Sequence, residues 1–270
     1  MLTDMIHRKE WQKYGFYLLI GIAILTILIL GAFKDPKSKT KTIVIDAGHG
    51  GHDHGCMYGG ANEKDITLSV SLLFGKMIQD SFPDYKIIFT RNNDSFVELY
   101  ERANIANRNN ADLFISIHVN ASPSISAYGT ETYAMGLHKT AGNLSVAKRE
   151  NASVLMEKDY QQNYDGFDPN SPEGHIIFSL YQNQFLSQSL SLASIVENKF
   201  KSKERYSRGV KQAGFLVLWK TTMPSILIET GYLSNAIERK YLVSNDGQLK
   251  TAESIYEAFK SYTASAWKEQ

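Results

Sequence analysis

The sequence contains one cysteine and almost no net charge, and both features exclude classes of site. A single cysteine, Cys56, permits neither an intramolecular disulfide nor a cysteine-rich zinc or iron–sulfur site, so any metal would need His, Asp and Glu ligands. The 29 Lys and Arg residues against 28 Asp and Glu leave a formal charge of +1, which excludes a protein built around a strongly basic nucleic-acid surface. With 43% hydrophobic and 21% charged residues, the chain of 270 residues can still form a large core.

An uncharged run near the N-terminus predicts insertion into a membrane or export across it. Residues 16–33 are 18 consecutive residues without a charge. As a helix they would extend about 27 Å, close to the roughly 30 Å of a bilayer core. Basic residues precede the run within 1–15, so the positive-inside rule places this short N-terminus in the cytoplasm and the rest of the chain outside. The run is either an uncleaved transmembrane anchor or a cleaved signal segment, and a polar linker follows at 34–41.

The exported part alternates between short apolar runs and helical patterns. The apolar runs predict strands at 42–46, 85–90, 113–118, 215–219 and 225–229, and a weak alternation predicts another at 130–135. Apolar residues at helical spacing predict a helix at 63–80, and further helices are predicted at 181–200 and 253–267. A capping box of Ser95 with Glu98 predicts a helix at 95–109, and Ser234 with Glu238 opens a shorter one. This alternation is typical of a single α/β domain, here 42–268, with a mostly parallel sheet flanked by helices.

One long segment departs from this alternation. Residues 138–175 are polar, begin with a helical pattern over Asn143–Asp159, and end in a loop rich in Asp, Asn, Pro and Gly. A long excursion inside a compact domain is usually functional or disordered.

Three of the predicted strands end in unusual polar residues. His49 follows the first strand, and His118 and Glu229 end two later strands. Because ligands of an open parallel sheet gather at the carboxyl ends of its strands, we expect these side chains to meet at one edge. Either histidine alone would more often be structural than a ligand. A carboxylate beside a buried apolar run is costly unless it is paired, protonated or near a metal, and a salt bridge is the structural alternative for Glu229.

Glu63 adds a third candidate ligand to the two histidines. A first-turn acid is commonly explained by the helix dipole alone. Together with His49 and His118, however, it makes a His₂Glu set that leaves zinc an open position for water, and Glu229 then suits the role of proton carrier. His52 and His54 in the same glycine-rich loop are alternative ligands, although exposed loop histidines are the simpler interpretation.

Taken together, four motifs resemble the zinc-dependent N-acetylmuramoyl-L-alanine amidases, cell-wall hydrolases related to the division amidases. The motifs are IVIDAGHGG (43–51), NEKDITL (62–68), the segment 91–122 ending in SIHVNAS, and SILIETGYLSN (225–235). The resemblance implies a sheet of about six strands, zinc bound by His49, Glu63 and His118, and Glu229 as the catalytic carboxylate. It also implies cleavage of the amide between N-acetylmuramic acid and L-alanine of the stem peptide. Tyr232 stands where the family commonly has Phe.

The same resemblance gives the 138–175 segment a regulatory interpretation, because division amidases carry an inhibitory helix at this place. We expect Asn143–Asp159 to cover the zinc, with Glu150 or Glu157 as a temporary ligand that a protein activator displaces. The implied partners are peptidoglycan and, through the N-terminal helix, the membrane, on the periplasmic side of the inner membrane. Two alternatives remain: a zinc peptidase that cuts within the stem peptide, and an inactive envelope-binding scaffold.

Overall fold

The computed structural model describes residues 40–168 and 184–267, together with the isolated positions 17, 19–21, 171 and 174. Contacts divide the chain into two units, Met1–Thr40 and Lys41–Gln270. The membrane segment predicted at 16–33 lies outside the described residues except at 17 and 19–21. Among the residues described, no helix is both long and apolar enough to span a bilayer.

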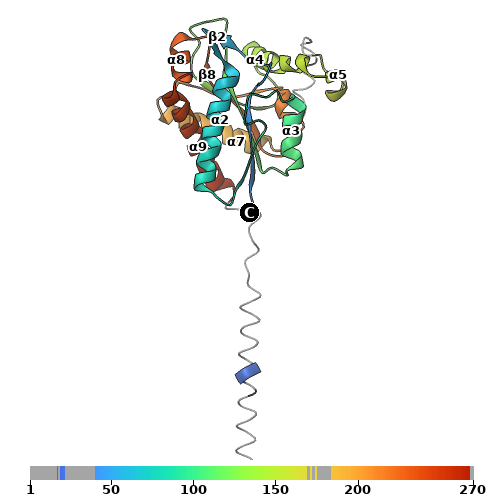
Figure 1. The fold of residues 1–270 in the computed structure, drawn as a ribbon, viewed down its shortest axis with the longest axis vertical. Coiled ribbons are helices and arrows are strands. Elements are labelled where there is room, and N and C mark those ends of the chain that lie inside the picture. Colours follow the sequence, from blue (N-terminus) through green and yellow to red (C-terminus); the bar gives the residue numbers. More distant parts are fainter. Residues whose placement is uncertain are drawn as a thin grey trace, which may run out of the picture. The chain divides into compact units, whose positions relative to one another are not determined.

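A sheet of six strands forms the centre of the second unit (Figure 1). The strand order is β4 (Lys86–Phe89), β1 (Thr42–Ala47), β5 (Leu113–Asn120), β8 (Ser225–Tyr232), β6 (Thr130–Met135) and β7 (Ser207–Ala213). All neighbouring strands pair in parallel except β6 and β8, which are antiparallel. The predicted α/β class and the mostly parallel sheet of about six strands are therefore confirmed. A two-stranded hairpin, β2 (Met57–Tyr58) with β3 (Ala61–Asn62), precedes the first long helix.

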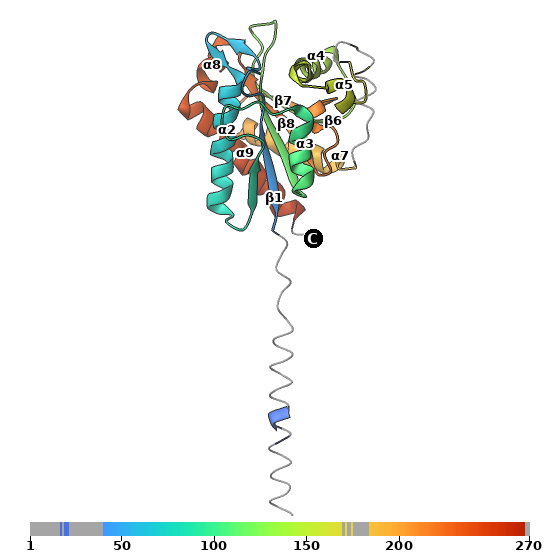
Figure 2. The same cartoon turned by 45° about the vertical axis from the view of Figure 1, so that its right-hand side comes forward.

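Helices cover both faces of this sheet (Figure 2). One face is covered by α2 (Glu63–Ser81), α7 (Leu186–Ser202) and α9 (Asn245–Ala266), and the other by α3 (Leu99–Arg108), α4 (Ala141–Asn151) and the 3₁₀ turns η1 (Ala152–Met156) and η2 (Leu216–Leu218). The short helices α5 (Tyr160–Asn163) and α8 (Ala236–Leu242) complete the described elements.

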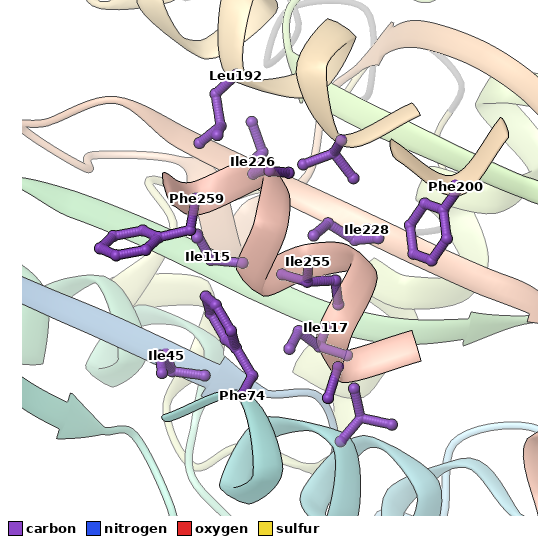
Figure 3. Packing of buried hydrophobic residues seen from close by; sticks show 14 of the residues in the cluster. Ile45, Phe74, Ile115, Ile117, Leu192, Phe200, Ile226, Ile228, Ile255 and Phe259 are labelled. Carbon is purple, nitrogen blue, oxygen red and sulfur yellow. The ribbon is translucent and has the colours of Figure 1, made fainter. Parts of the chain in front are cut away.

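The central strands are apolar throughout because both of their faces are buried. Successive residues of a strand point to opposite faces, so Ile43 and Ile45 of β1 contact the core under α2 and α9, while Val44 contacts the core under α3. Figure 3 shows the first of these cores, in which Phe74 of α2 and Phe259 of α9 lie over the isoleucines of the strands. The buried apolar runs were therefore a sound basis for predicting the strands.

Two features of the sheet region differ from the sequence predictions. The strand predicted at 215–219 is wrong, because Leu216–Leu218 form a 3₁₀ turn that buries its apolar side chains under α3. The sixth strand is β7 instead, a polar edge strand with alternating exposure that carries no apolar run. An edge strand contacts water along one side, so its sequence contains little of the hydrophobic signal on which prediction depends.

Helix ends also differ from the predictions. No capping box forms at Ser95: α3 begins four residues later, after Glu98, and α8 is capped by the side chain of Asn235 rather than by Ser234. The C-terminal helix begins at Asn245, eight residues earlier than predicted, with Ser244 as its cap. The helix predicted over Asn143–Asp159 is two elements, because α4 ends at Asn151 and η1 follows.

Candidate metal centre and active site

Four side chains converge at the carboxyl ends of the central strands. His49, Glu63, His118 and Glu150 each offer one ligand atom, and these atoms all lie within 4.8 Å of one another. They come from the loop after β1, the first residue of α2, strand β5 and helix α4. All four are buried. Glu229 lies beside them, since β5 and β8 pair His118 with Glu229. The predicted meeting of His49, His118 and Glu229 at one edge is confirmed.

The distances between the carboxylate oxygens and the imidazole nitrogens show that these atoms lie around a common centre. Oε1 of Glu63 lies 3.2 Å from Nε2 of His49 and 3.1 Å from Nδ1 of His118. Oε2 of Glu150 lies 3.1 Å and 3.0 Å from the same two nitrogens. Two imidazole nitrogens and two carboxylate oxygens form a donor set that suits tetrahedral zinc. The residues present therefore fit the metal that the family resemblance implies.

Asp53 orients the first histidine of the cluster. Its Oδ2 lies 2.8 Å from Nδ1 of His49, so that Nδ1–H donates to the carboxylate and Nε2 is free to face the centre. Such carboxylate partners fix the tautomer and orientation of a ligating histidine. Asp53 is not among the residues predicted from the sequence, where its only signal is an acid four residues after a candidate ligand.

Glycine at position 48 is required by the second histidine. A Cβ atom there would lie 2.4 Å from Cε1 of the His118 ring, closer than real Cβ contacts come. The next residue, His49, has φ of 62°, a left-handed conformation that few side chains adopt. Buried arginines stabilise this loop, since Arg102 donates to the His49 carbonyl (2.9 Å) and Arg91 to the Gly48 carbonyl (2.8 Å).

Burial and mutual charge shift the pKa values of the cluster strongly. Burial disfavours the charged imidazole of His49, but the Glu63 charge and the hydrogen bonds to Asp53, Glu150 and Glu63 together outweigh it and raise the pKa well above its usual value. His118 is raised to a pKa of about 9 against the same opposing burial, chiefly by Glu150. Burial opposes the ionised form of Glu63, but the His49 charge and the hydrogen bonds from His118 and His49 together lower its pKa. The carboxylates thus make the pocket attractive to cations, and zinc would displace protons from the histidines.

The pKa of Glu229 is shifted in the opposite direction from that of Glu63. Burial raises its pKa well above the usual range, and the neighbouring Glu150 carboxylate adds to the effect. Its Oε1 lies 3.4 Å from Nη2 of Arg149. Its Oε2 has no hydrogen-bond partner among the residues that the structure describes. A buried carboxyl with a high pKa and an unused oxygen is suited to take up and release a proton.

The remaining candidates lie outside the cluster. His52 is exposed and packs on Phe96 with ring centroids 4.1 Å apart, and His54 is also exposed. Glu157 accepts the backbone N–H of Leu99 at 2.6 Å. Of the two acids expected from the 138–175 segment, Glu150 enters the cluster and Glu157 instead caps a helix.

Comparison with known proteins decides the family. A family profile described as N-acetylmuramoyl-L-alanine amidase matches residues 43–261. This chain belongs to that family. Its members hydrolyse the amide bond between N-acetylmuramic acid and L-alanine in peptidoglycan, so the predicted family, hydrolase class and reaction are confirmed at the level of the family.

The amidase relatives cover most of this chain. AmiC of Escherichia coli O6:H1 is 33% identical over 86% of this chain, which spans 55% of that relative's length. AmiA of Escherichia coli K12 is 30% identical over 84% of this chain and 79% of its own length. The structure of AmiC2 of Nostoc punctiforme superposes with a TM-score of 0.61 at 28% identity, covering 83% of this chain and 97% of the other. CwlD of Clostridioides difficile, solved in complex with the GerS lipoprotein, gives 0.60 at 26% identity, covering 83% and 99%.

Proposed function

We propose that this chain is a zinc-dependent N-acetylmuramoyl-L-alanine amidase that acts on peptidoglycan outside the inner membrane. His49, Glu63 and His118 are its zinc ligands, and Glu229 is its catalytic carboxylate. The observation that carries the proposal is the buried donor set within 4.8 Å, placed beside a carboxyl group whose Oε2 is unused.

The protein's own groups account for the proton movements of the reaction. Bound zinc would polarise the scissile carbonyl and lower the pKa of a water to about 7. Glu229 takes the proton of the attacking water and gives it to the departing nitrogen of L-alanine. Burial raises the pKa of Glu229, so the carboxyl can hold that proton between the two steps. Asp53 keeps His49 oriented throughout.

Helix α4 blocks this site in the conformation that the structure describes. Glu150 occupies the remaining position of the donor set, and Arg149 contacts Glu229. Four protein donors leave no open position for water on a tetrahedral zinc. We therefore assign 138–175 an inhibitory role, with Glu150 as the temporary ligand. The GerS lipoprotein bound to the similar CwlD supports a protein activator as the partner that moves α4.

The N-terminal segment 16–33 is proposed to hold the enzyme at the membrane, beside its substrate. The support is its uncharged length and the basic residues before it. Anchoring and signal cleavage both place the catalytic unit on the periplasmic side of the inner membrane.

Digestion of purified peptidoglycan by the full-length zinc-loaded protein tests the function. An amidase releases intact stem peptides and leaves glycan chains without peptide, which mass analysis of the products resolves. Cuts within the stem would instead establish a peptidase. Stoichiometric zinc without any cleavage, even after α4 is opened by Arg149→Ala with Glu150→Ala, would favour the envelope-binding scaffold.

A further inference from the structure

Helix α4 places a guanidinium group on a set of oxygens beside Glu229. Nη1 of Arg149 donates to the carbonyl of Ala121 at 2.9 Å, and Nη2 donates to Oδ1 of Asn120 at 2.9 Å. The same Nη2 lies 3.4 Å from Oε1 of Glu229. The Arg149 guanidinium thus donates hydrogen bonds to two neutral carbonyl oxygens and also lies against the Glu229 carboxyl.

The oxygen of Asn120, and not its nitrogen, must face the site. On its other side, Nδ2 of Asn120 donates to Oε1 of Glu131 at 2.5 Å, and an ionised carboxylate can only accept. On the site side, Oδ1 accepts from Arg149, which can only donate, and from the backbone N–H of Ala121 at 2.8 Å. The amide orientation of this fully buried side chain therefore follows from its partners.

Glu131 is itself kept ionised by a network of donors. Lys211 and Arg208 form ion pairs with its Oε2, and the hydroxyls of Tyr133 and Tyr232 donate to Oε1 at 2.9 Å and 3.2 Å. Burial opposes ionisation, yet the charges and hydrogen bonds of Lys211, Tyr133 and Arg208 together outweigh it and lower the pKa of Glu131. Glu131 is also paired with Glu229 in the register of β6 and β8, so the network reaches the active site directly. Tyr232, the departure from the common Phe, contributes a hydrogen bond that Phe could not make.

We propose that Asn120 Oδ1 and the Ala121 carbonyl are a binding subsite for amide N–H groups of the stem peptide, and that Glu131 is the positioning residue that aims it. In this subsite the Arg149 guanidinium stands in for the substrate's donors while α4 is closed. The proposal rests on the proposed function, since Glu229 protonates the nitrogen of L-alanine and the peptide on the leaving side must lie next to it. Neutral carbonyl acceptors suit neutral amide donors, and both become free when Arg149 withdraws.

Kinetics in an open background test the subsite. Arg149→Ala with Glu150→Ala in the full-length protein removes the competing guanidinium, and Asn120→Ala is then added. We expect KM for solubilised peptidoglycan to rise about tenfold, as for the loss of one hydrogen bond to a buried partner, with kcat and zinc content nearly unchanged. Ser122→Ala is the matched control on the same loop, because its hydroxyl accepts from Ser124 N–H and not from Arg149.

Product inhibition separates the stem peptide from the sugar hydroxyls as the source of donors. Asn120→Ala should weaken inhibition by released stem peptide and leave inhibition by peptide-free glycan strands unchanged. Weaker inhibition by glycan strands with unchanged inhibition by stem peptide would overturn the proposed subsite but not the proposed function. An unchanged KM when Asn120→Ala is added to an active open variant would do the same. An open variant that cleaves nothing would overturn the proposed function instead.

Two milder variants keep the test decisive if Asn120→Ala does not fold. Glu131→Gln leaves Asn120 in place and removes the acceptor-only group that aims it, and Tyr232→Phe removes a single hydrogen bond to Glu131. Both should raise KM in the open background, Tyr232→Phe by less, without changing kcat. If folded Glu131→Gln protein keeps the KM of the open background, Glu131 is not a positioning residue.

Discussion

Glu229 combines a buried position, a raised pKa and an oxygen without a partner among the described residues, and these properties separate its proposed role from that of the proposed zinc ligands. Glu229→Gln keeps the size of the side chain but cannot accept and return a proton. We expect it to retain stoichiometric zinc while kcat falls by about 100-fold or more. Glu257→Gln, which alters a half-buried carboxylate on α9 paired with Lys203, is the matched control and should leave kcat unchanged. Normal turnover in Glu229→Gln would remove Glu229 from the reaction.

Gly48 is important because it has no Cβ atom, which leaves room for the His118 ring. Gly48→Ala would place a methyl group 2.4 Å from the His118 ring and must displace this proposed ligand. We expect zinc affinity to fall by about 10- to 100-fold, as for other losses of ligand orientation. Gly142→Ala, where the nearest atom is 3.7 Å away, should leave zinc affinity unchanged. Competition with a chromogenic chelator measures both, and equal affinities in the two variants would contradict the steric argument.

Asp46 stabilises the base of the site through a buried ion pair. It accepts from Arg102 at 2.8 Å and from Ser116 and Thr90 at 2.6 Å each. Burial would raise its pKa, but the Arg102 charge and the hydrogen bonds from Ser116 and Thr90 together outweigh that effect and lower it. Asp46→Ala leaves Arg102 buried without its partner, so we expect unfolding free energy to drop by about 3–5 kcal/mol in urea titrations.

The sign of the pH dependence follows from the lowered pKa of Asp46. Its stabilising contribution is complete above the unfolded pKa of about 3.9 and is lost as pH falls through the lower folded value. The stability gap between wild type and Asp46→Ala should therefore narrow only in strong acid. A gap that closes near neutral pH would contradict this assignment.

At the scale of the element, two acids of the 138–175 segment have different partners, one on α4 and one after η1. Glu150 contacts both histidines, whereas Glu157, after η1, accepts from Leu99 N–H and from the Tyr164 hydroxyl at 2.8 Å. Glu150→Ala should raise basal amidase activity about tenfold or more, because it frees one position of the donor set. Glu157→Ala should lower the melting temperature by several degrees, as for the loss of a helix cap, without raising activity. Dye release from labelled peptidoglycan and thermal unfolding distinguish them, and lower activity in folded Glu150→Ala would argue against inhibition.

At the scale of the whole molecule, contacts separate 1–40 from the catalytic unit. Because every residue of the donor set and of the two cores lies after Thr40, removal of 1–40 should leave zinc content and melting temperature unchanged. If 16–33 is an anchor, the truncated protein should also be absent from the membrane fraction that contains the full chain. If cells that express the full-length sequence instead yield only soluble protein that has been cleaved after the apolar run, that result would identify 16–33 as a signal segment.

Local sequence patterns predicted the secondary structure correctly where a type of residue has a single structural role. Apolar runs predicted four of the six strands correctly and weak alternation predicted a fifth, β6. The polar residues that end three of the apolar runs predicted the edge where the site lies. The edge strand β7 was missed because half of it faces water, and η2 was misread because an apolar run buries equally well in a turn. Helix ends were displaced because capping depends on which side chain reaches the first N–H groups.

The sequence by itself determined the α/β class, the strand ends that supply His49, His118 and Glu229, and the family. Only the tertiary structure decided between His49 and its loop neighbours and between Glu150 and Glu157. It also revealed Asp53 behind His49 and the Glu131–Asn120–Arg149 chain of hydrogen bonds. The physical reason is the sequence separation between the interacting residues. The patterns that predict strands and helices lie within short segments of the chain. The position of a candidate ligand and the orientation of an amide depend instead on atoms that folding brings to about 3 Å from residues far apart in sequence.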